Sequence, residues 1–361
     1  MADFEIAADI SVASTLPGRV YSDPEIFRLE RDRIFARTWH FVGHEDLVRV
    51  PGQVHPFTLL PGTLDEPLVV IRDERDRVRC LSNVCTHRGT LVVEGPGHLQ
   101  QLRCRYHGRR FHLDGRFHSM PEFDQAKGFP SKADDLPEVP LGWWEKFMLV
   151  SLEPIAPITD FVVPMAARLA GLPFDRLAFD GATARDYVVE ANWALYIDNF
   201  LEGFHIPYIH QSLAGTLDYG SYAVELERWS SLQLGIAKAG EAAFDLPPSH
   251  PDHGRDVAAY YWWLFPTTMF NVYPWGISVN VVTPLAVDRT KVSFLPFVWD
   301  ETKRESGAGA GLDRVEREDE AVVEAVQRGV RSRLYDRGRY SPTRETGVHH
   351  FHRLLAETLR V

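Results

Sequence analysis

The sequence predicts an α+β protein of two domains, an all-β module followed by a larger module that mixes helices and strands. Three observations support this prediction. Short apolar runs broken by turn residues fill residues 40–120, longer helical windows begin after Pro154, and runs rich in Tyr, Trp, Val and Thr occupy residues 258–297. The chain has 361 residues, of which 45% are hydrophobic and 25% charged, so it can form two cores and is not disordered overall.

We divide the chain at two composition changes. Residues 1–37 are expected to form an N-terminal segment that packs on the second module, residues 38–153 the all-β module, and residues 154–361 the second module. In the all-β module, the apolar runs 68–72 and 78–82 flank a charged turn, and the turn residues at 114 and 115 join two further short runs, so we expect hairpins. Residues 301–311 contain no apolar residue except alanine and are expected to form a mobile surface linker.

Charge and cysteine content exclude several classes of function. The chain carries 39 Lys and Arg against 50 Asp and Glu, a net charge of −11 that disfavours nucleic acid and anionic membranes as partners. No apolar run is long enough to cross a membrane, and the N-terminus lacks the basic start of a signal peptide, so we expect a soluble cytoplasmic protein. Three Cys exclude a disulfide scaffold, whereas three Cys beside fifteen His are residue types that suit metal sites.

The all-β module contains a paired motif, Cys85-Thr-His87-Arg-Gly and Cys104-Arg-Tyr-His107-Gly. Each half presents one thiolate and one imidazole on a tight loop that follows a predicted strand. Two Cys and two His also satisfy a zinc ion, but zinc fingers usually group Cys with Cys and His with His. Mixing one Cys and one His in each loop is typical of a Rieske 2Fe-2S cluster, in which two thiolates bind one iron and two imidazoles the other. The motif therefore favours the Rieske cluster over zinc.

A second motif lies between residues 192 and 210 and contains Glu202, His205 and His210. On a helix, Glu202 and His205 share a face, whereas His205 and His210 are about 140° apart. Pro207 is expected to break the helix between the two histidines, so that both imidazoles can converge on one metal ion. The spacing of two histidines alone is weak evidence, because a chance pair of structural histidines has the same pattern.

A third ligand should be a carboxylate if the site is a facial triad of two His and one carboxylate, which leaves positions open for O2 on Fe(II). The helix expected over about residues 312–334 carries an apolar stripe of Leu312, Val315, Val322, Val326 and Val330. Asp319 lies inside this stripe, whereas Glu316, Glu318 and Glu320 fall mostly outside it. A buried carboxylate is costly unless a metal ion compensates it, or unless it pairs with an arginine or caps another segment.

Together the two motifs resemble the Rieske non-haem iron oxygenases. The stretch N-W followed by D-N, E, H and H is similar to their catalytic-domain motif, and E-D-E-A-V-V-E-A-V-Q-R-G to their C-terminal ligand helix. The resemblance implies a Rieske domain and a helix-grip (START-like) catalytic domain with an antiparallel sheet and a long C-terminal helix. Residue by residue it assigns the 2Fe-2S cluster to Cys85, His87, Cys104 and His107. It assigns the mononuclear Fe(II) to His205, His210 and Asp319.

The resemblance also gives roles to two further residues. Glu202 matches the carboxylate that bridges the Rieske histidine of one subunit to the iron histidine of the next, and Asn199 matches a residue that lies close to the iron. Most of the family has Asp at the bridging position. The longer Glu resembles the branch that acts on quaternary ammonium compounds such as carnitine and betaine. The stretch G-V-H-H-F-H-R-L-L-A resembles the end of the choline monooxygenase-like members, and we assign its histidines no chemistry.

The implied activity is oxygenation with O2 and electrons from NAD(P)H. A flavin and iron-sulfur reductase, with or without a ferredoxin, would supply the electrons, and a head-to-tail homotrimer would bring one chain's cluster to its neighbour's iron. The expected outcome is hydroxylation or N-demethylation of a small molecule. Alternatives are an aromatic-ring hydroxylating oxygenase, a Rieske electron carrier and a zinc-stabilised binding module. The aromatic residues between 260 and 275 could form a cage for a quaternary ammonium group or simply pack in the core.

Overall fold

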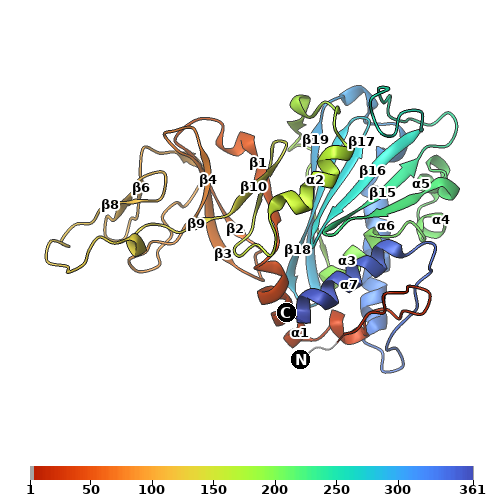
Figure 1. Cartoon of the computed structure of the whole chain (residues 1–361), viewed down its shortest axis with the longest axis horizontal. Coiled ribbons are helices and arrows are strands. Elements are labelled where there is room, and N and C mark those ends of the chain that lie inside the picture. The colour runs from red at the N-terminus through yellow and green to blue at the C-terminus, as the bar shows by residue number, and fades with distance from the viewer. Residues whose placement is uncertain (1–3, 361) are drawn as a thin grey trace. The chain divides into compact units, whose positions relative to one another are not determined.

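A computed structural model describes residues 4–360, which form two compact units (Figure 1). One unit comprises residues 36–155. The other combines the N-terminal segment, up to Phe35, with the chain from Ala156 onward. Residues 1–3 and 361, which we included in the N-terminal segment and in the second module, lie outside the described residues.

The smaller unit is built from antiparallel strands, as the sequence predicts. Its central sheet has five strands in the order β5-β2-β3-β4-β9, and two three-stranded sheets have the orders β1-β11-β10 and β6-β7-β8. Their bounds are β1 (His40–His44), β2 (Gln53–Leu59), β3 (Glu66–Arg72), β4 (Val78–Ser82), β5 (Gly97–His98), β6 (Leu102–Arg103), β7 (Arg110–Phe111), β8 (Phe117–Ser119), β9 (Glu138–Val139), β10 (Leu141–Trp144) and β11 (Phe147–Val150). The turn at residues 114 and 115 joins β7 to β8, so the expected hairpin is present.

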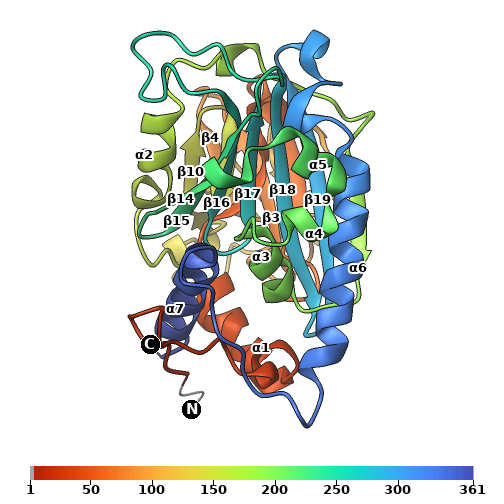
Figure 2. The same ribbon diagram turned by 90° about the vertical axis from the view of Figure 1, so that its right-hand side faces the viewer.

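The larger unit has one antiparallel sheet of eight strands. Seven strands follow the order β12-β19-β18-β17-β16-β15-β14, and β13 also pairs with β19. Their bounds are β12 (Ala178–Phe179), β13 (Arg185–Val189), β14 (Ala223–Leu226), β15 (Ser230–Ile236), β16 (Val257–Leu264), β17 (Thr268–Tyr273), β18 (Gly276–Ala286) and β19 (Arg289–Val298). The helices are α1 (Pro24–Glu30), α2 (Ile158–Arg168), α3 (Trp193–Phe200), α4 (Ile206–Ile209), α5 (Gln211–Thr216), α6 (Leu312–Val330) and α7 (Thr346–Arg360). Figure 2 shows α3, α4, α5 and α6 on one face of this sheet. The antiparallel sheet and the long helix α6 agree with the fold that the resemblance implies.

Helix α6 differs from its prediction in length and in the face that it buries. It ends at Val330, four residues before the expected end at Leu334, whose side chain is fully exposed. The buried face contains Val323 and Gln327, whereas Val326, which we placed in the apolar stripe, is 41% exposed. Hydrophobicity could not reveal this face, because the buried Gln327 is stabilised by hydrogen bonds to the backbone of other segments.

The segment 301–311 is not simply a mobile linker. It forms two short turns, Glu301–Lys303 and Gly307–Gly309, and Ala308 is buried against Tyr273 and Trp275. Its small residues permit this close approach to the aromatic rings, since a Cβ at Gly309 would collide with both of them.

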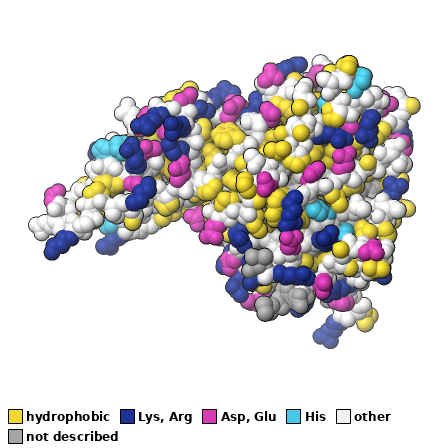
Figure 3. All heavy atoms as spheres, in the orientation of Figure 1, with side chains coloured by type: hydrophobic (Ala, Val, Ile, Leu, Met, Phe, Trp, Pro, Cys, Tyr) yellow, Lys and Arg dark blue, Asp and Glu magenta, His cyan; other side chains and the backbone are white. Residues whose placement is uncertain are grey.

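On the face drawn in Figure 3, basic and acidic side chains are intermixed with hydrophobic ones. Across residues 4–360, no helix combines the length and the apolar character that crossing a membrane requires.

Candidate active site

Two loops in the smaller unit, residues 85–90 and 104–109, have the same backbone geometry, and we call them the Rieske loops. The Gly89 amide donates to the Cys85 carbonyl at 2.9 Å, and the Gly108 amide donates to the Cys104 carbonyl at 3.1 Å. Both glycines have a φ of 74°, a left-handed conformation that glycine adopts without strain. One tight turn is therefore used twice, and each copy carries one Cys and one His.

The side chains of the Rieske loops are arranged in like pairs. Cys85 and Cys104 are buried side by side, and burial followed by the neighbouring thiol raises the pKa of Cys85. The rings of His87 and His107 lie edge to face with centroids 4.8 Å apart. Cys thus lies beside Cys and His beside His, which fits one like pair on each of two irons.

Arg109 supports the second Rieske loop, a role that was not predicted from its position in the sequence. Its buried guanidinium donates to the Asp134 carboxylate at 2.7 Å and lies over the ring of Phe117 at 5.1 Å from the centroid. This pairing compensates the buried charge and fixes the chain directly after Gly108.

We expected the second motif to form one helix that Pro207 breaks, and this prediction is wrong. Helix α3 ends at Phe200, residues 201–205 are irregular, and Pro207 lies in the first turn of the short helix α4. Proline is tolerated there because the first amides of a helix have no partner within it. His205 and His210 flank α4 at opposite ends, so the early end of α3 and the shortness of α4 together let the imidazoles converge.

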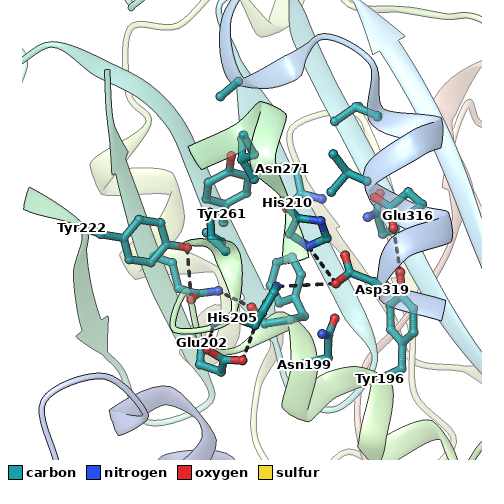
Figure 4. Close-up of a pocket in the computed structure, with 18 of the residues that line it drawn as sticks. Tyr196, Asn199, Glu202, His205, His210, Tyr222, Tyr261, Asn271, Glu316 and Asp319 are labelled. Carbon is teal, nitrogen blue, oxygen red and sulfur yellow. Dashed lines mark hydrogen bonds and ion pairs between the residues drawn. The ribbon is translucent and has the colours of Figure 1, made fainter. Parts of the chain in front are cut away.

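His205, His210 and Asp319 form a cluster that we call the iron triad (Figure 4). The Nε2 atom of His210 lies 2.9 Å from Oδ1 of Asp319, and the Nε2 atom of His205 lies 3.5 Å from the same oxygen. Ligand atoms about 2.1 Å from an ion and at right angles to each other are roughly 3 Å apart. The spacing therefore fits three ligands on one face of an octahedral ion. No arginine partner of Asp319 exists among the described residues, so the alternative of a buried Asp-Arg pair is wrong.

Two outer carboxylates orient the imidazoles of the iron triad. Glu202 Oε1 lies 2.6 Å from Nδ1 of His205, and Glu318 Oε2 lies 2.9 Å from Nδ1 of His210. Each carboxylate accepts a hydrogen bond from the Nδ1–H of its histidine. The proton therefore stays on Nδ1, and each Nε2 presents a lone pair toward Asp319. Two lone pairs and a carboxylate aimed at one point repel each other unless a cation lies between them. The residues present therefore fit a divalent metal ion.

Glu318 was outside the stripe that we expected to be buried, yet it takes part in the site. The hydrogen bond from His210 lowers the pKa of Glu318, which keeps the carboxylate charged. Its position directly before Asp319 did not predict this role, because adjacent residues on an ideal helix face different directions.

The end of α3 is held by a buried hydrogen-bond network. Asp198 accepts from the Tyr21 hydroxyl at 2.9 Å and lies 2.7 Å from Nε2 of His352, whose Nδ1 contacts the Tyr340 hydroxyl at 2.7 Å. The network anchors α3 one turn before Glu202. His352 was one of the C-terminal histidines to which we assigned no chemistry, and here it has a structural role.

A cavity of about 80 Å³ adjoins the iron triad. Four tyrosines line it, namely Tyr196, Tyr222, Tyr261 and Tyr273, and we call it the tyrosine cavity. Asn199 also lines it and lies near Asp319 in Figure 4. Of the aromatic residues that we considered as a cage, only Tyr261 and Tyr273 reach this cavity.

The other aromatic residues of that set have different surroundings. Trp275 stacks on Tyr273 with ring centroids 5.4 Å apart. Trp263 packs against Phe265 in the core, and the Tyr260 hydroxyl donates to Asp252. Strand alternation explains why only part of the set faces the cavity.

Glu316 also lines the tyrosine cavity, although we expected it to fall mostly outside the buried stripe. The Tyr196 hydroxyl donates to its carboxylate at 2.9 Å (Figure 4). Burial first, and the negative charge of Asp319 second, raise the pKa of Glu316 well above its ordinary value. Glu316 lies three residues before Asp319 on α6, and this spacing predicts that the two side chains share one face of the helix.

Comparison with known families places both units of the chain in one family. Residues 174–360 match the family model of the ring-hydroxylating alpha subunit, catalytic domain, and residues 38–130 match the Rieske [2Fe-2S] domain. The chain belongs to the Rieske ring-hydroxylating alpha-subunit family. As the sequence predicted, this oxygenase is an oxidoreductase with a Rieske 2Fe-2S cluster and a mononuclear iron, and it uses O2 and NAD(P)H-derived electrons. The match excludes the zinc-stabilised module. Alpha subunits of this family work with reductases and form oligomers.

Individual relatives span nearly the whole chain. It is 31% identical to the chloroplastic choline monooxygenase of Arabidopsis thaliana, over 99% of this chain and 86% of that protein. It is 28% identical to the carnitine monooxygenase oxygenase subunit of Escherichia coli K12, over 96% of this chain and 94% of that subunit. The quaternary ammonium Rieske monooxygenase CntA has the same fold, with a TM-score of 0.81 at 24% identity and 99% coverage of both chains. Naphthalene 1,2-dioxygenase shares the fold with a TM-score of 0.75 at 19% identity, over 99% of this chain and 95% of that one.

Proposed function

We propose that this Rieske oxygenase hydroxylates a carbon of a small quaternary ammonium compound. The observation that carries the proposal is the position of the iron triad in the wall of a cavity lined by four tyrosines. Aromatic faces attract a methylated ammonium group, which cannot donate hydrogen bonds. The similarity to choline and carnitine monooxygenases along almost the entire chain supports this substrate class. If the oxidised carbon is an N-methyl group, the hydroxymethyl product loses formaldehyde, so hydroxylation and demethylation are one reaction.

In this proposal Cys85 and Cys104 hold one iron of the cluster, and His87 and His107 hold the other. His205, His210 and Asp319 hold the mononuclear iron. When bound, the cluster supplies electrons and the mononuclear iron supplies the site at which O2 is activated.

The outer residues of the site keep the iron triad ready for that chemistry. Glu202 and Glu318 accept hydrogen bonds from the Nδ1–H groups of the two imidazoles. The protons stay on Nδ1, so both Nε2 atoms remain free to bind metal. The tyrosines exclude water from the cavity and orient the substrate. Asn199 takes a positioning role beside Asp319.

Glu202 is proposed to have a second role between subunits. In a head-to-tail homotrimer it would connect His107 of a neighbouring subunit to His205, and electrons would pass along this route. A flavin and iron-sulfur reductase, with or without a ferredoxin, would deliver them to the cluster. Heterologous contacts that close into a ring give each chain one such junction.

The experiment that tests the proposal combines the purified protein with NADH and a generic Rieske reductase. O2 uptake and product are measured with choline, carnitine, betaine and small aromatic compounds. We expect uptake matched by product for a quaternary ammonium compound. Product from aromatic compounds alone would replace the substrate class, and reduction of the cluster without any product would favour a Rieske electron carrier.

A further inference from the structure

Glu316 is an acidic group in the tyrosine cavity that the proposed mechanism does not use. It lies on α6 one turn before Asp319 and is close to the mononuclear site without belonging to the iron triad. Its partner is the Tyr196 hydroxyl, which can stabilise a carboxylate but cannot neutralise it. The other acids of the cavity, Glu202 and Asp319, already contact the imidazoles of the triad.

The tyrosine cavity offers Glu316 no Lys or Arg partner among the described residues that line it, and its two histidines, His205 and His210, belong to the iron triad. Glu316 also borders an adjoining cavity that contains Arg185 and Arg304. Arg304 is occupied by Asp180 at 2.7 Å, and Arg185 donates to the backbone carbonyls of Ala182 and Ala184, just before its strand. The carboxylate is therefore half-buried, with a hydroxyl partner and without a Lys or Arg counter-ion.

A half-buried carboxylate in this position has two ways to reduce the cost of desolvation. It can hold a proton, or it can pair with a cation that enters the cavity. Desolvation, followed by the charge of Asp319, raises the pKa of Glu316 and so favours the protonated form in the empty cavity. Aromatic rings nearby make the second state available to an organic cation, because Tyr261 and Tyr273 meet edge to face at 5.9 Å and Tyr222 lines the same cavity.

We propose that Glu316 is a specificity-determining residue, whose carboxylate is the counter-ion of the substrate's quaternary ammonium group. The inference rests on the proposed function and deepens it. The tyrosine rings contact the methyl groups of the cation, and Tyr196 positions the carboxylate. Binding exchanges one cation for one proton: the protonated acid and the free cation give the ion pair and a proton released to solvent. A neutral substrate of the same shape cannot make this exchange.

The test compares choline with 3,3-dimethyl-1-butanol, in which a carbon atom replaces the charged nitrogen. Binding of both to the metal-loaded protein is measured by isothermal titration calorimetry for the wild type, Glu316→Gln and Glu320→Gln. Glutamine keeps the size of the side chain and its hydrogen bond to Tyr196. Glu320 is the matched control, an acid with a raised pKa on the same helix that does not line the cavity.

We expect Glu316→Gln to raise the Kd of choline at least about tenfold and the Kd of the neutral analogue less than about twofold. Glu320→Gln should change neither. Titrations in buffers of different ionisation enthalpy should detect proton release for the wild type and none for Glu316→Gln.

Equal choline binding by the wild type and Glu316→Gln would overturn the inference and leave the proposed function intact. An equal loss of both ligands would also overturn it, since it would show a structural role. If the wild type binds neither choline nor tetramethylammonium, carnitine or betaine, the proposed substrate class fails, and the role of Glu316 fails with it.

Discussion

The Rieske loops and the iron triad solve the same problem, holding metal ligands in place, by different means. In each Rieske loop the Cys and His are close in sequence, and a hydrogen bond from Gly89 or Gly108 closes the turn. The residues of the iron triad come from the two ends of α4 and from α6, more than a hundred residues apart, and outer carboxylates orient the two histidines. The first site depends on local backbone geometry and the second on tertiary packing. Changes that damage one should therefore leave the other intact.

The largest effect is expected from removing a ligand of the iron triad. Asp319→Ala should lose the mononuclear iron, so that iron falls from three to two atoms per chain and turnover falls at least about a thousandfold. Visible absorption of the cluster should remain. Metal analysis and absorption spectra check both results. Cys104→Ser is the counterpart and should lose the cluster absorption, and loss of that absorption in Asp319→Ala would contradict the independence of the two sites.

Glu202→Gln tests the connection between the two sites. We expect both metal centres to assemble and product formation to fall by about a hundredfold, because the amide cannot replace the carboxylate that holds His205. Reduction of the cluster and product per reduced cluster are measured in parallel. Near-normal turnover would exclude the proposed route through Glu202.

Glu318→Gln tests the outer carboxylates alone. Loss of the charge behind His210 should weaken iron binding at the triad by about 10- to 100-fold, without effect on the cluster. Equilibrium competition with a ferrous chelator measures the affinity. Glu324→Gln, on the same helix but accepting from the backbone amide of the exposed Glu190, should bind iron like the wild type. Equal affinity in Glu318→Gln and the control would exclude an orienting role.

The catalytic unit also contains a buried acid that no metal compensates. Burial raises the pKa of Glu30 to about 8, and the hydrogen bond from Trp193 opposes this shift only in part. Between its ordinary pKa and 8 the folded state binds more protons than the unfolded state, so stability falls as pH rises through this window. Glu30→Gln should be more stable than the wild type by on the order of 4 kcal/mol at pH 8 and by less than about 1 kcal/mol at pH 5. Parallel urea unfolding curves at both pH values, with no pH-dependent difference, would contradict this.

The smallest effect is expected in the Rieske loops themselves. A Cβ at Gly89 meets no atom within 4 Å, so Gly89→Ala introduces only the strain of a left-handed alanine, about 1–2 kcal/mol. Gly95 has equally open surroundings and an ordinary φ, so Gly95→Ala is the matched control. The rate of cluster loss in urea should increase for Gly89→Ala alone. Equal rates would show that the turn conformation does not hold the cluster.

The contrast between local backbone geometry in the Rieske loops and tertiary packing at the iron triad explains what could be predicted from the sequence. The Rieske loops were predicted from spacing, because their geometry is local. The proposed third ligand, Asp319, required the periodicity of a helix as well. The positions of Glu316 and Glu318 at the site were missed, since they depend on how α6 is rotated against the sheet. Buried Gln327 helps to fix that rotation through tertiary hydrogen bonds that no hydrophobic pattern records.

The sequence pattern also did not predict where the helix before α4 ends. We expected the helix to break at Pro207, but the chain leaves α3 at Leu201 and Pro207 lies in the first turn of the next helix. Proline is compatible with both positions. Packing around Asp198 and His352 fixes the end of α3, and these partners are distant in sequence.

A single-turnover experiment tests most directly whether the two sites act as one oxygenase. The fully reduced protein is mixed with O2 and choline, and cluster absorbance and product are followed together for the wild type and Asp319→Ala. We predict that in the wild type the cluster is oxidised as product forms and that choline accelerates this oxidation. In Asp319→Ala the oxidation should be slow and without product. Oxidation of the cluster at the wild-type rate in Asp319→Ala would contradict the account, because the electrons would not be passing to the iron triad.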